Sequence, residues 1–244
     1  MSRSNPKLQN PCQMFIDYKG DKGQFFFYDK EKEMQIEVQT PIYFVVLDEL
    51  STITGYSKKH DCGIYSNEVN STVNEILRVK TFKGGENITG KYADVRDSIV
   101  ALGGKFTKSV YAMLIRQDEQ PIMVNFKFRG AAFGAWLEKK FNPDNCVVGI
   151  TDFVEEKNGA TTYQVPVFKA FKLLPEINEQ AIVFDRQLQE YLKEYKSQQP
   201  EKEIAKAETV IQPKDEWQGS ANKEAIVNKA KEQEQNDELS DLPF

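Results

Sequence analysis

The sequence predicts a mainly β fold followed by a disordered acidic tail. Short runs of aromatic and β-branched residues alternate with turn residues through most of the chain, which is typical of strands. Only three stretches have the features of helices. After Lys196 the chain becomes rich in Lys, Glu, Gln and Asn, so it cannot bury enough apolar surface to offset its ordering entropy.

Strands dominate the expected order of elements. Residues 1–13 are polar and contain two prolines, which predicts a flexible N-terminal arm. A dense aromatic strand at 24–28 pairs with 34–38 across a polar turn, and the apolar run 42–47 predicts a buried strand. Further strands are expected at 53–56, 63–65, 75–83, 109–116, 122–128, 147–154 and 162–173, the last two joined by a turn at Lys157-Asn158-Gly159.

Three helices complete the expected fold. Residues 92–102 run into Gly103, residues 131–141 end at Asn142-Pro143, and residues 178–195 have apolar side chains at three-to-four spacing. A helix between the third and fourth strands of a small, partly open barrel belongs to the OB-type pattern, and residues 131–141 fit that position. We therefore predict an OB-type β-barrel with added strands over residues 14–196, followed by the tail over 197–244.

Composition argues against several functional classes. No apolar run approaches the roughly 20 residues of a membrane helix, and the N-terminus lacks the apolar core of a signal peptide, so we expect a soluble, cytoplasmic protein with no membrane partner. Cys12, Cys62 and Cys146 are widely spaced, which argues against disulfides and zinc. Residues 85–91 match the glycine and lysine spacing of a phosphate-binding loop, but Tyr92 replaces its Mg²⁺-binding hydroxyl residue. We expect no enzyme activity, no metal and no cofactor.

Charge is distributed unevenly along the chain. The formal net charge is −5, yet residues 78–140 carry 12 Lys/Arg against 6 Asp/Glu, a net charge of +6. Aromatic residues lie among these cations, and cations beside exposed rings suit phosphate contact and base stacking. The alternative is that these cations are solvated and the rings are packed. The predicted DNA-binding residues are Lys58, Lys59, Tyr65, Arg78, Lys80, Phe82, Lys83, Lys105, Phe106, Lys108, Tyr111, Lys127 and Arg129.

The last eight residues have the composition of a docking peptide. An exposed Phe244 after Pro243 can fill an apolar pocket while its α-carboxylate meets a basic residue. This tip resembles that of single-stranded-DNA-binding proteins of bacteria and their phages, which end in acidic residues, an aliphatic residue, Pro and Phe. By that resemblance the tip contacts replication and recombination proteins of the polymerase, helicase or primase class. Its partner-binding residues are Asp237, Glu238, Asp241, Leu242, Pro243 and Phe244.

These features together predict a protein that binds and protects single-stranded DNA with little sequence preference. The expected setting is DNA replication, recombination and repair, in the host cytoplasm if the protein is phage-encoded. One alternative is a phage structural or assembly protein with an acidic interaction tail. Another is an OB-type protein that binds RNA or duplex DNA.

Overall fold

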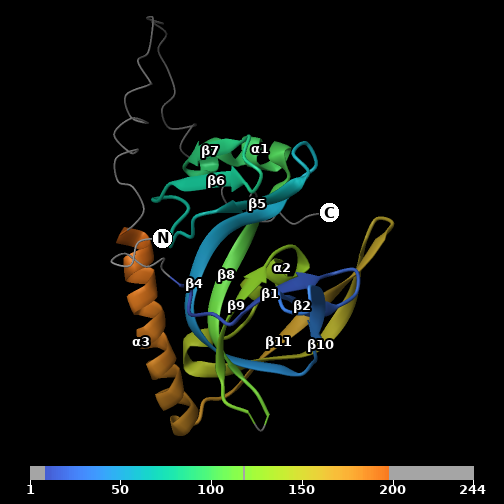
Figure 1. The fold of residues 1–244 in the computed structure, drawn as a ribbon. Helices are drawn as coiled ribbons and strands as arrows, with labels where there is room; N and C mark the ends of the chain where they lie inside the picture. Colours follow the sequence, from blue (N-terminus) through green and yellow to red (C-terminus); the bar gives the residue numbers. More distant parts are fainter. Residues whose placement is uncertain (1–8, 118, 198–244) are drawn as a thin grey trace, which may run out of the picture.

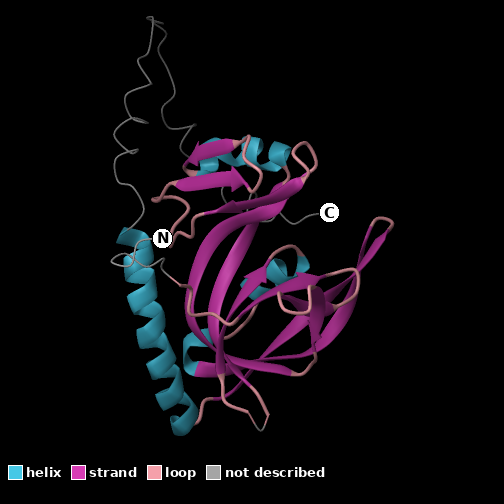
Figure 2. Ribbon diagram, viewed as in Figure 1, coloured by secondary structure: helices cyan, strands magenta, loops and turns pink. Residues whose placement is uncertain are grey.

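The computed structural model describes residues 9–117 and 119–197, which form eleven strands, three α-helices and one short 3₁₀-helix (Figures 1 and 2). The strands are β1 (Met14–Lys19), β2 (Gln24–Asp29), β3 (Met34–Val38), β4 (Ile42–Ser57), β5 (Cys62–Ser66), β6 (Leu77–Thr81), β7 (Asn87–Gly90), β8 (Gly104–Ile115), β9 (Ile122–Phe128), β10 (Cys146–Asn158) and β11 (Thr161–Lys172). The helices are α1 (Tyr92–Leu102), α2 (Ala131–Leu137), η1 (Pro143–Asn145) and α3 (Pro175–Ser197).

All eleven strands belong to one sheet. Its main path runs β3-β2-β1-β9-β8-β4-β5-β6-β7, and β10 pairs with both β4 and β11. The β1–β9 pair is parallel, and the other pairs are antiparallel. The prediction of a mainly β fold is confirmed. The sheet is open at β3 and β7, and it is larger than the five strands of a simple OB-type barrel.

The longest strands differ most from the sequence-based expectation. The runs 42–47 and 53–56 are one continuous strand, β4, which passes through Asp48 and Glu49 and has a register shift between Val46 and Asp48. Such a bulge bends a strand, and β4 and β8 are long curved ribbons in Figure 1. Strands β1 and β7 were not expected, and α2 ends at Leu137 rather than at residue 141.

The N-terminal arm is packed where it is described. Cys12 is buried against α3 residues, and the amide of Gln13 donates to the carbonyl of Met123 at 2.8 Å. Residues 10–13 therefore continue into β1 as part of the packed domain, contrary to the prediction of a flexible arm. Residues 1–8 and the tail residues 198–244, including the tip, lie outside the described part of the chain.

Cross-strand register divides the sheet into two faces, because directly opposed residues point to the same side. One side, the core face, packs against α2 and β11, where Phe128 and Trp136 have ring centroids 5.1 Å apart. Helix α1 extends this core over β5–β7 through Ile99. The other side is covered by α3 through Leu188 and Leu192 (Figure 1).

The rest of that second side has no helix over it within residues 9–117 and 119–197. We call this part the open face. It is formed by β5, β6 and the adjoining ends of β4, β8 and β9. The opposite side of β6 is fully packed, because Leu77, Val79 and Thr81 are buried.

Candidate nucleic-acid interface

A row of four side chains crosses the open face. Lys80 of β6 is directly opposite Tyr65 of β5, Tyr65 is opposite Thr54 of β4, and Thr54 is opposite Lys105 of β8. Three strand spacings of about 4.8 Å separate the two lysines, a span of about 14 Å. We call these four residues the Lys80–Lys105 row. It brings together residues that are far apart in the sequence.

Two exposed rings lie at the Lys80 end of the row. Tyr65 and Phe82 are 40% and 72% exposed, and their ring centroids are 4.6 Å apart at an interplanar angle of 35°. Phe82 follows β6 directly, and its amide donates to the carbonyl of Gly63 at 3.0 Å. Its ring lies over Gly63, where an added Cβ would come within 2.8 Å of Cδ2. Glycine at 63 therefore permits this ring position.

Two lysines without an ion pair, Lys80 and Lys105, accompany these rings. Among the described residues, neither Lys80 nor Lys105 has a salt bridge or a side-chain hydrogen bond, and both are exposed. Arg78 lies two residues before Lys80 on the same side of β6. Lys80, Lys105 and Arg78 therefore place positive charge on the same face as the rings.

Three further predicted lysines lie at the edge of the open face. Lys58 and Lys59 are in the β4–β5 turn, and Lys83 follows Phe82. Lys59 pairs with Glu86 at 2.7 Å, and Lys83 pairs with Asp61 at 3.6 Å. Exposed ion pairs of this kind are worth about 1 kcal/mol or less. A phosphate can therefore replace either carboxylate at small cost.

Arg129 lies near the Lys105 end of the row. One guanidinium nitrogen pairs with Asp17 at 3.4 Å, and the other donates to Thr54 Oγ1 at 3.5 Å. Thr54 also shares a 2.6 Å hydrogen bond with Thr107. Burial raises the pKa of Asp17, although Arg129 opposes that effect. The side chain of Arg129 is thus oriented by contacts with β1 and β4.

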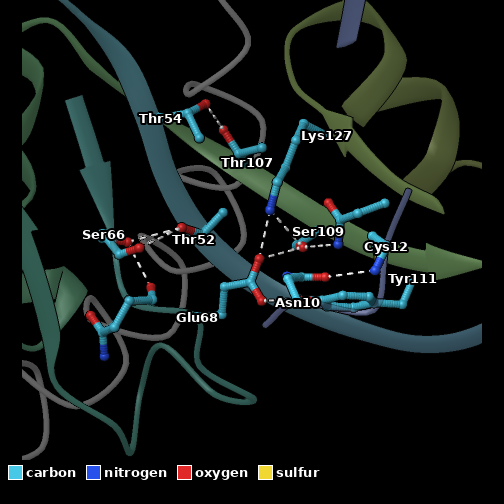
Figure 3. Close-up of polar contacts among 12 residues, drawn as sticks. Asn10, Cys12, Thr52, Thr54, Ser66, Glu68, Thr107, Ser109, Tyr111 and Lys127 are labelled. Carbon is cyan, nitrogen blue, oxygen red and sulfur yellow. Dashed lines mark hydrogen bonds and ion pairs between the residues drawn. The ribbon is translucent and has the colours of Figure 1, made fainter. Parts of the chain in front are cut away.

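Lys127 and Tyr111 are largely buried and paired within the protein, contrary to their prediction as DNA-binding residues. Lys127 Nζ pairs with Glu68 Oε1 at 2.6 Å, and the Tyr111 hydroxyl donates to Glu68 Oε2 at 2.6 Å (Figure 3). Ser109 adds a hydrogen bond to the same carboxylate at 2.7 Å. We call these four residues the Glu68 network. Tyr111 is 1% exposed and contacts the core beneath α3.

The loop between β5 and β6 explains this burial. It bridges β4 through Val69 and Ser51, and the amide of Glu68 donates to the Tyr195 hydroxyl of α3 at 3.0 Å. Burial acts to raise the pKa of Glu68, but Lys127 and the two hydroxyls outweigh it and lower that pKa. Glu68 is therefore an ionised carboxylate that neutralises Lys127 inside the protein.

Phe106 and Lys108, two of the predicted DNA-binding residues, do not lie on the open face. Successive strand residues point to opposite faces, so Lys105 lies on the open face while Phe106 and Lys108 lie on the core face. Phe106 packs between Tyr92 and Phe133, with ring centroids 5.4 and 5.3 Å away. Lys108 pairs with Glu49 at 3.6 Å. Neither side chain belongs to the Lys80–Lys105 row.

The open face also includes residues that the sequence analysis missed. Thr54 completes the row, and Tyr56 is an exposed ring two residues further along the same side of β4. The Tyr56 hydroxyl donates to Asp61. The spacing of two residues between Thr54 and Tyr56 places both side chains on the same side of a strand. The sequence does not show that this side is the open face, because that depends on the register of β4 with β5.

Residues 9–117 and 119–197 contain no group of three or more His, Cys, Asp or Glu residues positioned to hold a metal ion. Helices in the same residues include none long and apolar enough to span a membrane. Comparisons with protein-family models, with curated proteins and with solved structures found no match.

Proposed function

We propose that this protein binds single-stranded DNA across the Lys80–Lys105 row, with little preference for sequence and without a catalytic step. The observation that carries the proposal is the exposed Tyr65–Phe82 pair beside the unpaired ammonium of Lys80. Rings of this kind stack on unpaired bases, and the cations contact the phosphates between them. A duplex hides the faces of its bases, so the same surface favours single strands.

The proposed role is to protect single-stranded DNA during replication, recombination and repair. Stacking is tolerant of sequence because every base has a face, which suits a protein that must cover any exposed strand. We also propose that the domain is an OB-type barrel. It is supported by the run β9-β8-β4-β10-β11, in which β4 pairs on both sides and α2 lies between β9 and β10 in chain order.

Salt dependence tests the proposal directly. Fluorescence anisotropy with labelled oligo-dT should give an affinity that falls steeply with salt, and tighter binding than to matched duplex DNA or RNA. Lys80→Gln should reduce the slope of log K against log salt by about 0.7, one phosphate contact to a single strand. The matched control is Lys32→Gln, in the turn between β2 and β3, which should leave the slope unchanged.

Two results would count against this function. If the protein shows no salt-sensitive preference for single-stranded DNA, the alternative of a phage structural or assembly protein gains support. If Lys80→Gln and Lys32→Gln change the slope equally, the charge effect is diffuse and the row is not the site.

We propose in addition that the C-terminal tip recruits partner proteins of the polymerase, helicase or primase class. Support comes from the sequence of residues 237–244, which lie outside the described part of the chain. Deleting Phe244 should weaken binding to a purified partner of this class by at least about tenfold, because buried aromatic anchors dominate such interfaces. Ser240→Ala is the control within the tip. Equal binding after removal of Phe244 would show that the tip is not the contact.

A further inference from the structure

A cavity of about 300 Å³ opens beside the Lys105 end of the row. Its walls come from four parts of the chain that meet there: the end of β1, the start of β8, the β9–α2 junction and the tip of the β10–β11 hairpin. The residues that line it are Tyr18, Gly20, Lys105, Arg129, Gly130, Ala131, Asn158, Thr161 and Tyr163. Its volume is at the lower end of the range for small-molecule sites, which suits one nucleotide unit and excludes several.

Hydrogen bonds between β1 and β11 hold the cavity walls together. The Tyr18 hydroxyl donates to the carbonyl of Gln164 at 2.7 Å, and the amide of Gln164 donates to the carbonyl of Gly20 at 2.7 Å. Tyr18 is also stacked on Phe153 of β10, with ring centroids 6.1 Å apart. The cavity is therefore formed in the folded protein before any ligand arrives.

The lining of the cavity is cationic, aromatic and polar. Lys105 and Arg129 supply two positive charges, and Tyr163 supplies a second ring besides Tyr18. Asn158 adds an amide that can donate to and accept from the edge of a base. Two carboxylates border it: Asp17 pairs with Arg129 at 3.4 Å, and Glu156 accepts from the Tyr163 hydroxyl at 2.9 Å. Lys105 has no ion pair among the described residues, so its charge remains for a phosphate.

We infer that this cavity is a subsite for a single nucleotide of the bound strand, with the phosphate held by Lys105 and Arg129 and the base placed between the hairpin tip and β1. The inference rests on the proposed function, because Lys105 belongs both to the row and to the cavity. A strand that crosses Phe82, Tyr65 and Thr54 reaches the mouth of the cavity at Lys105. One nucleotide is thereby enclosed, while its neighbours stack on an open surface.

A cavity-filling substitution tests this subsite without removing a charge. Thr161 is exposed at the hairpin tip and lines the cavity, so Thr161→Phe fills it at little cost to the fold. We expect Thr161→Phe to weaken binding of an oligo-dT of about 20 nucleotides by about tenfold, the contribution of one stacked base. Thr162→Phe is the matched control, because its side chain is exposed on the other side of the strand. It should change the affinity less than about twofold.

Binding of dTMP alone separates this inference from the proposed function. NMR titration should show saturable dTMP shifts at Gly130 and Thr161 that Thr161→Phe abolishes and Thr162→Phe keeps. If wild-type protein fails to bind oligo-dT but shows these shifts, the proposed function is overturned, and the cavity binds a free nucleotide rather than one unit of a bound strand. If oligo-dT binds equally well to both variants and dTMP produces no such shifts, the subsite is overturned and the function stands. Unchanged thermal midpoints of the two variants confirm that both are folded.

Discussion

Replacing Phe82 by alanine should weaken oligo-dT binding by about 1–3 kcal/mol, roughly five- to 150-fold, because one base loses its stacking surface. The ring is 72% exposed and touches little of the core, so the free energy of unfolding should hardly change. Tyr65→Ala should have an effect of similar size, because the two rings are in contact at 4.6 Å. Anisotropy titrations at one fixed salt concentration give these affinities.

The control for this prediction is another exposed ring on the same sheet. Tyr28 of β2 is 56% exposed, but strands β1 and β9 separate β2 from the nearest strand of the row, β8. Tyr28→Ala should leave oligo-dT affinity within about twofold of wild type. Equal losses from Phe82→Ala and Tyr28→Ala would mean that exposed rings contribute nonspecifically. No loss from either Phe82→Ala or Tyr65→Ala would remove the main support for the proposed function.

Replacing Lys127 by methionine should lower the free energy of unfolding by about 3–5 kcal/mol, because it leaves the Glu68 carboxylate buried without its counter-ion. The side chains of Lys127 and Glu68 are only 15% and 12% exposed, so water cannot replace the lost partner. Chemical denaturation with a shared m-value measures the loss. The double variant Lys127→Met with Glu68→Gln should recover most of it, because the uncharged amide can accept from one of the Ser109 and Tyr111 hydroxyls through its oxygen and donate to the other through its NH2 group.

The dependence of stability on pH provides a second test of the Glu68 network. The pKa of Glu68 in the folded protein lies below its ordinary value of 4.5, so its ionised form contributes stability above that pH. This contribution is lost as the pH falls below 4.5 and through the folded-state pKa. The double variant should therefore lose less stability than wild type as the pH falls from 5 through the folded-state pKa of Glu68. An equal loss in both proteins, or a Lys127→Met protein as stable as wild type, would contradict a structural role for this ion pair.

Much of the open face could be predicted from local pattern. Alternation in residues 76–83 assigns Arg78, Lys80 and Phe82 to one side, and the burial of the intervening residues agrees with that assignment. In residues 122–128 the same pattern correctly places Phe126 and Phe128 in the core. Both segments are single strands with one packed side, which is where a period of two is most informative.

The pattern failed where a distant segment covers the sheet. Lys127 and Lys80 look alike in sequence, because each is a lysine in the alternating pattern of a strand, Lys127 between Phe126 and Phe128 and Lys80 between Val79 and Thr81. Lys127 lies beneath the β5–β6 loop and α3, which bring Glu68 and Tyr195 over it, whereas nothing in the described chain covers Lys80. The sequence of residues 122–129 gives no indication of that loop, because Glu68 and Lys127 are 59 positions apart in the chain.

The sequence by itself therefore determined the mainly β class, the basic character of residues 78–140 and the two-sided pattern of each strand, because these depend on nearest neighbours. Only the tertiary structure decided which of the cations face solvent. The pairing of β6, β5, β4 and β8 aligns Lys80, Tyr65, Thr54 and Lys105 into one row, and the packing of α3 with the β5–β6 loop removes Lys127 and Tyr111 from it. Register and coverage arise from contacts between segments distant in the chain, and a strand pattern contains no information about them.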